Sequence, residues 1–334
     1  MFSKKSLRPV AGALLSMPFL RLAGFALAAA APAASFAHAA TVPAAMVPAA
    51  AGQVAMTGLP LRRQGALFKV TRQNEVGYLF GTIHVGAKAL YPLAPEISAA
   101  LAASSELVLE LDTRPNDRYQ HALANHARYR HGEHIRTHVS PDTLVRLTDA
   151  LHAVGIPLSS VSHLKPWLLA NFLMGLELER SGYQRSDGNE LFLLAQAQAR
   201  GTAVAELESA DEQLALFDTL SSVDSESYLR ESLAQLGDGT SLRRAKATID
   251  AWSSGDPVAL DAVSADAVSG DSVMAQFTRR TLLGKRNPDM AARIAGMMEE
   301  GRKPFVGVGV LHLLGDESVP HLLSQRGYQV VRMY

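Results

Sequence analysis

The chain has 334 residues and a formal net charge of zero, with 32 basic and 32 acidic residues interspersed along it. Nucleic-acid binding is disfavoured because no stretch forms a basic stripe interleaved with aromatic side chains. The absence of cysteine excludes disulfides, thiolate catalysis and a lipoprotein-type lipid anchor.

Residues 1–39 have the three parts of a secretory signal peptide. A basic segment is followed by an apolar run over 22–36 and by a small-x-small sequence, which predicts cleavage after Ala39. An uncleaved membrane anchor is the alternative, but Arg21 and Pro32 limit the apolar length. We therefore expect a periplasmic or secreted protein, with no stable membrane insertion after signal cleavage.

Residues 40–60 are rich in Ala, Pro and Val, a composition that predicts a disordered leader. The folded domain is then expected over residues 61–334. That length suits one large domain or two small ones.

Six apolar segments are predicted to be β-strands, and helical patterns separate most of them. The segments centre near residues 67, 77, 107, 204, 306 and 330. Strands that alternate with helices indicate an α/β fold. We expect a central mixed β-sheet flanked by helices, with a helical middle region.

Helix caps and amphipathic spacing mark the predicted helices. These cover 118–154, 165–181, 191–200, 211–220, 225–236, 242–252 and 290–300. Asp187 and Asn287 are interpreted as helix caps, with Glu190 completing a capping box. Residues 253–272, rich in Ala, Ser, Gly and Asp, are predicted to be a loop or insertion.

Two histidines follow a glycine near the end of a predicted strand by the same interval. His84 lies three residues after Gly81, and His312 lies three residues after Gly309. A single histidine of this kind is more often structural and held in a turn. The repeat favours one shared site. Each glycine there lets the backbone either approach another group closely or adopt a conformation that other residues avoid.

Carboxylates near strand ends complete the candidate set. Glu110 lies in the apolar segment 106–112, where burial requires a partner or a metal unless the residue is exposed at the strand end. Two imidazoles and one carboxylate leave positions open for water and substrate, as a catalytic metal site requires. Glu208 or Asp112 is then a candidate general base, or a residue that orients a histidine.

The five histidines between residues 121 and 138 are not expected to form the site. His131 and His134 lack the spacing of the zinc-binding HExxH helix, and arginines are interleaved with the histidines. The tract is therefore interpreted as a solvated face. Arg286 is open to interpretation as a surface arginine, although it precedes the helix that leads to the second histidine strand. Serine-hydrolase and NTPase motifs do not occur.

Together, these motifs resemble the TraB/PrgY/GumN family, in particular its secreted GumN-like bacterial branch. The resemblance covers residues 61–334 and rests on the segments 78–84, 106–112, 207–213, 285–287 and 305–315. It implies a ChaN/erythromycin-esterase-like α/β fold. The stretch after Trp252 has no motif that aligns with the family.

The TIKI proteins, animal relatives within this family, are membrane-tethered metalloproteases that depend on manganese or cobalt. The resemblance therefore implies a secreted metal-dependent hydrolase of peptidase type, acting on a peptide or protein, with Mn or Co suspected and Zn possible. The implied metal ligands are His84, Glu110 and His312; Glu208 is a further catalytic candidate; Gly81, Gly309 and Arg286 are the candidate cofactor-binding residues.

Two alternatives stay open at this point. The ChaN relatives bind haem, so a periplasmic haem- or metal-binding protein without catalysis is one of them. A degenerate scaffold whose site is unused is the other.

Overall fold

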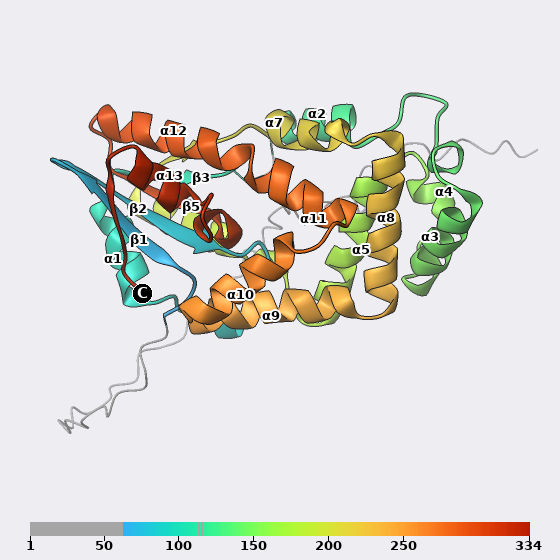
Figure 1. Ribbon diagram of the computed structural model, residues 1–334, viewed down its shortest axis with the longest axis horizontal. Coiled ribbons are helices and arrows are strands. Elements are labelled where there is room, and N and C mark those ends of the chain that lie inside the picture. Colours follow the sequence, from blue (N-terminus) through green and yellow to red (C-terminus); the bar gives the residue numbers. More distant parts are fainter. Residues whose placement is uncertain (1–62, 113, 115) are drawn as a thin grey trace, which may run out of the picture.

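The computed structural model describes residues 63–112, 114 and 116–334 (Figure 1). The predicted signal peptide (1–39) and leader (40–60) lie outside these residues. Within the described part of the chain, no helix has both the length and the apolar character that crossing a membrane requires.

Six strands form one mixed sheet in the order β4-β3-β5-β2-β1-β6. The strands are β1 (Leu67–Arg72), β2 (Glu75–Thr82), β3 (Glu106–Leu109), β4 (Ala203–Glu206), β5 (Pro304–Gly309) and β6 (Gln329–Arg332). β1 pairs antiparallel with β2 and β6, whereas β2, β5, β3 and β4 run parallel. Each strand lies where the sequence predicts one, so the α/β fold with a mixed sheet is confirmed.

Helices fill the connections between the strands, except the turn at residues 73–74 that joins β1 to β2. Between β2 and β3 lie η3 (Lys88–Leu90) and α1 (Pro95–Ala103). Between β3 and β4 lie α2 (Asp117–His126), η4 (Ile135–Thr137), α3 (Pro141–Ala153), α4 (Leu158–Val161), α5 (Pro166–Arg180), η5 (Arg185–Asp187) and α6 (Asn189–Arg200). Between β4 and β5 lie α7 (Ala210–Ala215), η6 (Leu216–Thr219), α8 (Ser222–Gly237), α9 (Thr240–Ser254), α10 (Pro257–Val268), α11 (Val273–Phe277), the π-helix η7 (Thr278–Leu283) and α12 (Arg286–Glu299). Between β5 and β6 lie η8 (Val310–Leu313) and α13 (Val319–Gln325).

The hydrophobic core has two parts. Phe80 of β2 packs in the sheet core, with its ring centroid 6.2 Å from that of Trp252 and 6.1 Å from that of Phe305. The second part lies among helices, where Trp167 and Phe217 stack at 4.2 Å. Figure 1 shows α3, α5 and α8 of this helical part at the right, beyond the end of the sheet.

The parallel strands end at the same edge of the sheet. Thr82, the last residue of β2, is level with Gly309, the last residue of β5, and Leu109 of β3 is level with Gly307. Side chains that directly follow these ends therefore meet at one edge, where α/β sheets bind ligands.

Residues 253–272 are mostly helical, so the prediction of a loop is wrong. α9 continues to Ser254, and α10 follows over Pro257–Val268. The Asp256 side chain accepts a hydrogen bond from Val258 N–H, and Pro257 occupies the first turn. Alanine favours a helix once it is capped in this way, although the composition of the segment resembles a linker.

Three further sequence interpretations are wrong. The segment predicted to be helical over 118–154 is interrupted after His126, where α2 ends, whereas the helix start predicted at Ser140–Asp142 is confirmed, because Ser140 caps α3. Asn287 lies within α12 rather than at its cap. Gly188, not Asp187, is the N-cap of α6, and no side chain caps that helix.

Candidate functional site

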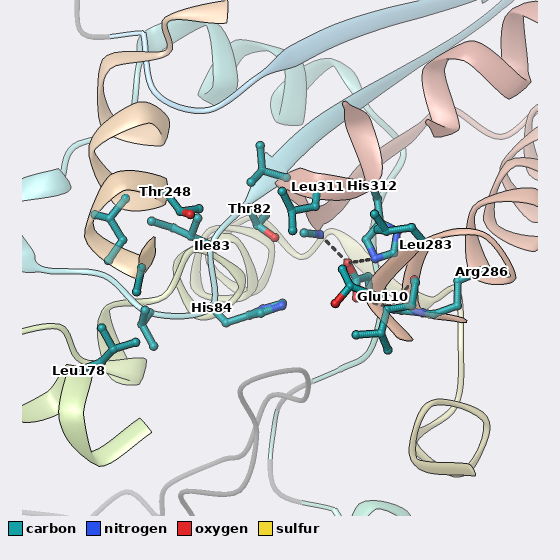
Figure 2. Close-up of a pocket in the computed structure, with 17 residues that line it drawn as sticks. Thr82, Ile83, His84, Glu110, Leu178, Thr248, Leu283, Arg286, Leu311 and His312 are labelled. Carbon is teal, nitrogen blue, oxygen red and sulfur yellow. Dashed lines mark hydrogen bonds and ion pairs between the residues drawn. The ribbon is translucent and has the colours of Figure 1, made fainter. Parts of the chain in front are cut away.

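A cavity of about 260 Å³ opens where the parallel strands end (Figure 2). His84, Glu110, Arg286 and His312 all line it. The structure therefore brings both histidines and the carboxylate to one edge of the sheet, together with an arginine. Figure 2 shows the ring of His84 directed across the cavity toward Glu110.

Gly309 lies at the centre of this group. A methyl group on its Cα would lie 3.2 Å from Glu110 Oε1, 3.7 Å from His84 Nε2 and 3.7 Å from His312 Cδ2. Its φ of −49° is one that any residue adopts. Gly81 also lacks a positive φ, and a methyl there would lie 2.8 Å from Val310 Cγ2. Both glycines therefore allow neighbouring side chains to lie close to the backbone, and neither is needed for an unusual backbone conformation.

Glu190 fixes the orientation of His84. Its Oε1 atom lies 2.9 Å from His84 Nδ1 and accepts a hydrogen bond of 2.6 Å from the Thr82 hydroxyl. The neighbouring Asn189 side chain accepts a hydrogen bond of 2.9 Å from Ile83 N–H. The first turn of α6 thus holds the segment after β2 and leaves His84 Nε2 free to face the cavity.

Asn287 fixes the orientation of His312. Its Oδ1 atom lies 2.5 Å from His312 Nδ1, while its amide group donates to the carbonyl of Glu317 at 2.7 Å. Because the amide is used in this way, the hydrogen-bond network assigns the proton to His312 Nδ1 and leaves Nε2 as an acceptor.

The two histidines are held in opposite protonation states in the absence of a metal. Burial lowers the pKa of His312 to about 3, with Arg286 adding to the effect and Glu110 opposing it. Burial also lowers the pKa of His84, but the charge and hydrogen bond of Glu190, with the charge of Glu110, raise it to about 9. At neutral pH, His84 is therefore protonated and His312 is neutral.

Arg286 links the two carboxylates of the site. Its Nη2 atom lies 2.7 Å from Glu110 Oε2 and 2.7 Å from Glu208 Oε2, and its Nε contacts both oxygens of Glu208 at 3.0 Å. Its side chain is only 8% exposed, so the surface-arginine interpretation is wrong. Burial raises the pKa of Glu110, but the charges of Arg286 and protonated His84, with the backbone N–H of Gly309, hold it well below its usual range.

Glu208 and Asp112 lie apart from the histidines. Glu208 accepts hydrogen bonds from Arg286 and, at 2.8 Å, from Gln213 Nε2, and it is not among the residues that line the cavity. Asp112 pairs with Arg114. Glu208 thus positions Arg286, whereas Glu190 and Asn287 orient the histidines. Sequence reasoning missed both orienting residues because each sits in a helix-start pattern that resembles a cap.

The donor set suits a divalent ion. Each histidine is held through Nδ1 and keeps Nε2 for a ligand, as metal-binding histidines usually do. His312 Nε2 lies 3.6 Å from Glu110 Oε1, a separation that two ligands of one ion at about 2 Å can adopt. In the described residues, no three His, Asp or Glu side chains already stand at metal-binding spacing. Metal binding would therefore require His84 to move closer and lose its proton.

The histidine-rich tract lies away from this cavity. His131 and His134 are exposed and do not line it. His126 instead pairs with Asp211 at 2.9 Å and with Asp218 at 2.5 Å. The exposure of His121, His131 and His134 agrees with the interpretation of the tract as a solvated face, whereas His126 is mostly covered by its carboxylate partners.

The chain was compared with known protein families, curated proteins and solved structures. The model of the TraB/PrgY/gumN family matches residues 66–332 of the chain. The "Uncharacterized protein YbaP" of Shigella flexneri is 25% identical over 255 residues, which cover 75% of this chain and 88% of that protein. YbaP of Escherichia coli (strain K12) gives the same identity and coverage. No solved structure matches the chain.

Proposed function

This chain belongs to the TraB/PrgY/gumN family, and from that premise we propose that it is a secreted metal-dependent hydrolase of peptidase type. One observation carries the proposal. His84, Glu110 and His312 surround Gly309 at the edge of the sheet, and a separate side chain holds each histidine through Nδ1.

A divalent ion would be held by Nε2 of His84, Nε2 of His312 and an oxygen of Glu110. Manganese and cobalt are the leading candidates, and zinc suits the same donors. When bound, such an ion lowers the pKa of water and polarises a carbonyl group.

Arg286 supplies the fixed positive charge of the site. Its Nε and Nη2 atoms are occupied by Glu208 and Glu110, whereas Nη1 makes only a 3.5 Å contact with the carbonyl of Leu282. Arg286 lines the cavity, and Nη1 keeps donor capacity. This donor would stabilise the negative charge that develops on a carbonyl oxygen during hydrolysis.

The haem-binding alternative has less support. A cavity of about 260 Å³ lies below the roughly 300 to 1,000 Å³ that is usual for pockets holding drug-sized ligands. It accommodates one part of a longer substrate more readily than a whole porphyrin.

Peptide hydrolysis by the purified chain tests the proposal. Activity on a mixed fluorogenic peptide set should disappear on chelation and return with Mn²⁺ or Co²⁺. His84→Ala and His312→Ala should each abolish it, and His134→Ala, the matched control on the exposed tract, should not. Activity that resists chelation would instead favour metal-free acid–base chemistry by protonated His84 and neutral His312. A Soret band that appears on haem titration and disappears in His84→Ala would favour the haem alternative.

The secreted location rests on the sequence of residues 1–39 alone. N-terminal sequencing of the periplasmic protein should give Ala40 as the first residue. A start at Met1, or a membrane-bound product, would contradict cleavage after Ala39.

A further inference from the structure

Part of the cavity lining comes from helices α5, α9 and η7 rather than from the strand ends. It is formed by five aliphatic side chains and two threonines from three helices: Leu178 of α5; Ala245, Thr248 and Ile249 of α9; Thr278, Leu282 and Leu283 of η7. We call these seven residues the aliphatic wall. Figure 2 shows Leu178 and Thr248 at the left of the cavity and Leu283 at the right, beside Arg286.

No side chain of the aliphatic wall is charged or titratable. Among the described residues that line the cavity, the charged or titratable ones are His84, Glu110 and His312, which follow strand ends, and Arg286, which begins α12 next to η7. The Thr248 hydroxyl donates to the carbonyl of Arg244 at 3.0 Å, so its proton needs no partner from a ligand. A cationic ligand group placed against this wall would lose its hydration without compensation.

Local geometry directs the wall residues into the cavity. Ala245, Thr248 and Ile249 follow the three- and four-residue spacing of one helix face, and Ala247 between them is exposed. In η7, Gly284 N–H donates to the carbonyl of Arg279 at 2.9 Å, which is the wider i to i+5 turn of a π-helix. This turn lets the adjacent Leu282 and Leu283 both line the cavity.

We propose that the aliphatic wall is a specificity pocket for an aliphatic side chain next to the bond that is hydrolysed. The inference rests on the proposed peptidase function and adds its substrate class. The scissile carbonyl lies at the histidines and Glu110, and the neighbouring side chain packs between α9 and η7. Leucine-like residues are selected over alanine, because each methylene in an apolar pocket changes discrimination by about 10- to 200-fold. Lysine is excluded, because no wall side chain compensates its charge and the nearest charged group is the guanidinium of Arg286.

A peptide series that varies one residue tests this selectivity. The metal-loaded full chain is assayed on fluorogenic peptides with Leu, Ala, Asp or Lys on either side of the cleaved bond. Cleavage next to Leu should exceed cleavage next to Ala by at least about tenfold in kcat/KM. Equal rates for Leu and Ala, or faster cleavage next to Asp or Lys, would overturn the proposal.

A matched pair of variants on α9 assigns the selectivity to the wall. Ala245→Leu fills the pocket, whereas Ala247→Leu adds the same atoms to the exposed face of the same helix. Ala245→Leu should lower kcat/KM for the Leu peptide about tenfold and leave the Ala peptide within about twofold. Ala247→Leu should change neither value. Equal effects of the two variants would overturn the assignment.

Binding without hydrolysis separates this inference from the proposed function. N-acetyl-leucinamide, titrated into the metal-free protein, should shift the methyl NMR signals of Ile249 and Leu282 at lower concentration than N-acetyl-alaninamide does. Ala245→Leu should weaken that binding, and Ala247→Leu should not. If no peptide is hydrolysed but the two amides still differ in binding, the proposed peptidase function is wrong and the proposed aliphatic pocket is supported. If the two amides bind alike, the wall proposal fails whatever the activity.

Discussion

The side-chain oxygen of Asn287 lies 2.5 Å from Nδ1 of His312. The same amide donates to the carbonyl of Glu317, which prevents it from turning. Asn287 is the second residue of α12, directly after Arg286. One helix start therefore places both the guanidinium beside Glu110 and the acceptor that orients His312.

Replacement of Asn287 should weaken metal binding, although Asn287 itself does not line the cavity. Asn287→Ala leaves the buried Nδ1 of His312 without its partner, so we expect a loss of metal affinity of about 10- to 100-fold. The unpaired group should also lower the free energy of unfolding by roughly 1 to 3 kcal/mol. Calorimetric titration with Mn²⁺ and chemical denaturation measure the two effects. Asn287→Asp keeps an acceptor and serves as the control, and unchanged affinity in Asn287→Ala would contradict the orienting role.

Glu190 should control the protonation of His84. Glu190→Gln keeps an oxygen near Nδ1 but removes the charge that helps to raise the pKa of His84 to about 9. NMR titration of the metal-free variant should therefore give a lower pKa for His84. A pKa that stays near 9 would show that Glu190 is not the cause.

The same pair predicts how stability depends on pH. The pKa of His84 is raised above its ordinary value of 6.5. The contribution of His84 to the free energy of unfolding is therefore fully present below pH 6.5 and is lost as pH rises through about 9. The pKa of Glu190 is lowered from 4.5, so the contribution of Glu190 to the free energy of unfolding is present above pH 4.5. The difference in unfolding free energy between wild type and Glu190→Gln should thus be largest between these limits and smaller at pH 9. Denaturation of the metal-free proteins across this range tests the trend, and a difference that grows above pH 6.5 would contradict it.

The two site glycines should respond differently to substitution. In Gly309→Ala the new methyl meets Glu110 Oε1 at 3.2 Å, so metal affinity should fall more than stability. In Gly81→Val the added atoms meet Val310 from 2.8 Å in a buried position, which should destabilise the fold by about 1 to 3 kcal/mol. Metal titration and thermal denaturation of each variant distinguish the cases. The opposite pattern, with Gly309→Ala losing mainly stability, would show that Gly309 is a packing residue.

The strands and the candidate ligands were predictable because they depend on local pattern. Apolar runs define each strand, and parallel neighbours must end at one edge, so the residues after Thr82, Leu109 and Gly309 are brought together. His84, Glu110 and His312 stand at those positions. No detailed side-chain geometry is needed for this inference.

The orienting residues could not be found in the same way. Glu190 contacts a histidine 106 positions away, and Asn287 contacts one 25 positions away. Both lie at helix starts, where acidic and amide side chains usually serve as caps. The π-helical turn of η7 also has no sequence signature. The aliphatic wall depends on the tertiary contacts that bring α9 and η7 to the sheet edge, which the sequence pattern does not specify.

Anomalous diffraction from crystals soaked with Mn²⁺ tests the central claim most directly. The account predicts one strong peak about 2 Å from Nε2 of His84, Nε2 of His312 and a carboxylate oxygen of Glu110. Crystals of His84→Ala should lose that peak, and crystals of His134→Ala should keep it. A manganese peak elsewhere, with none between the two histidines, would contradict the claim that these residues hold the metal.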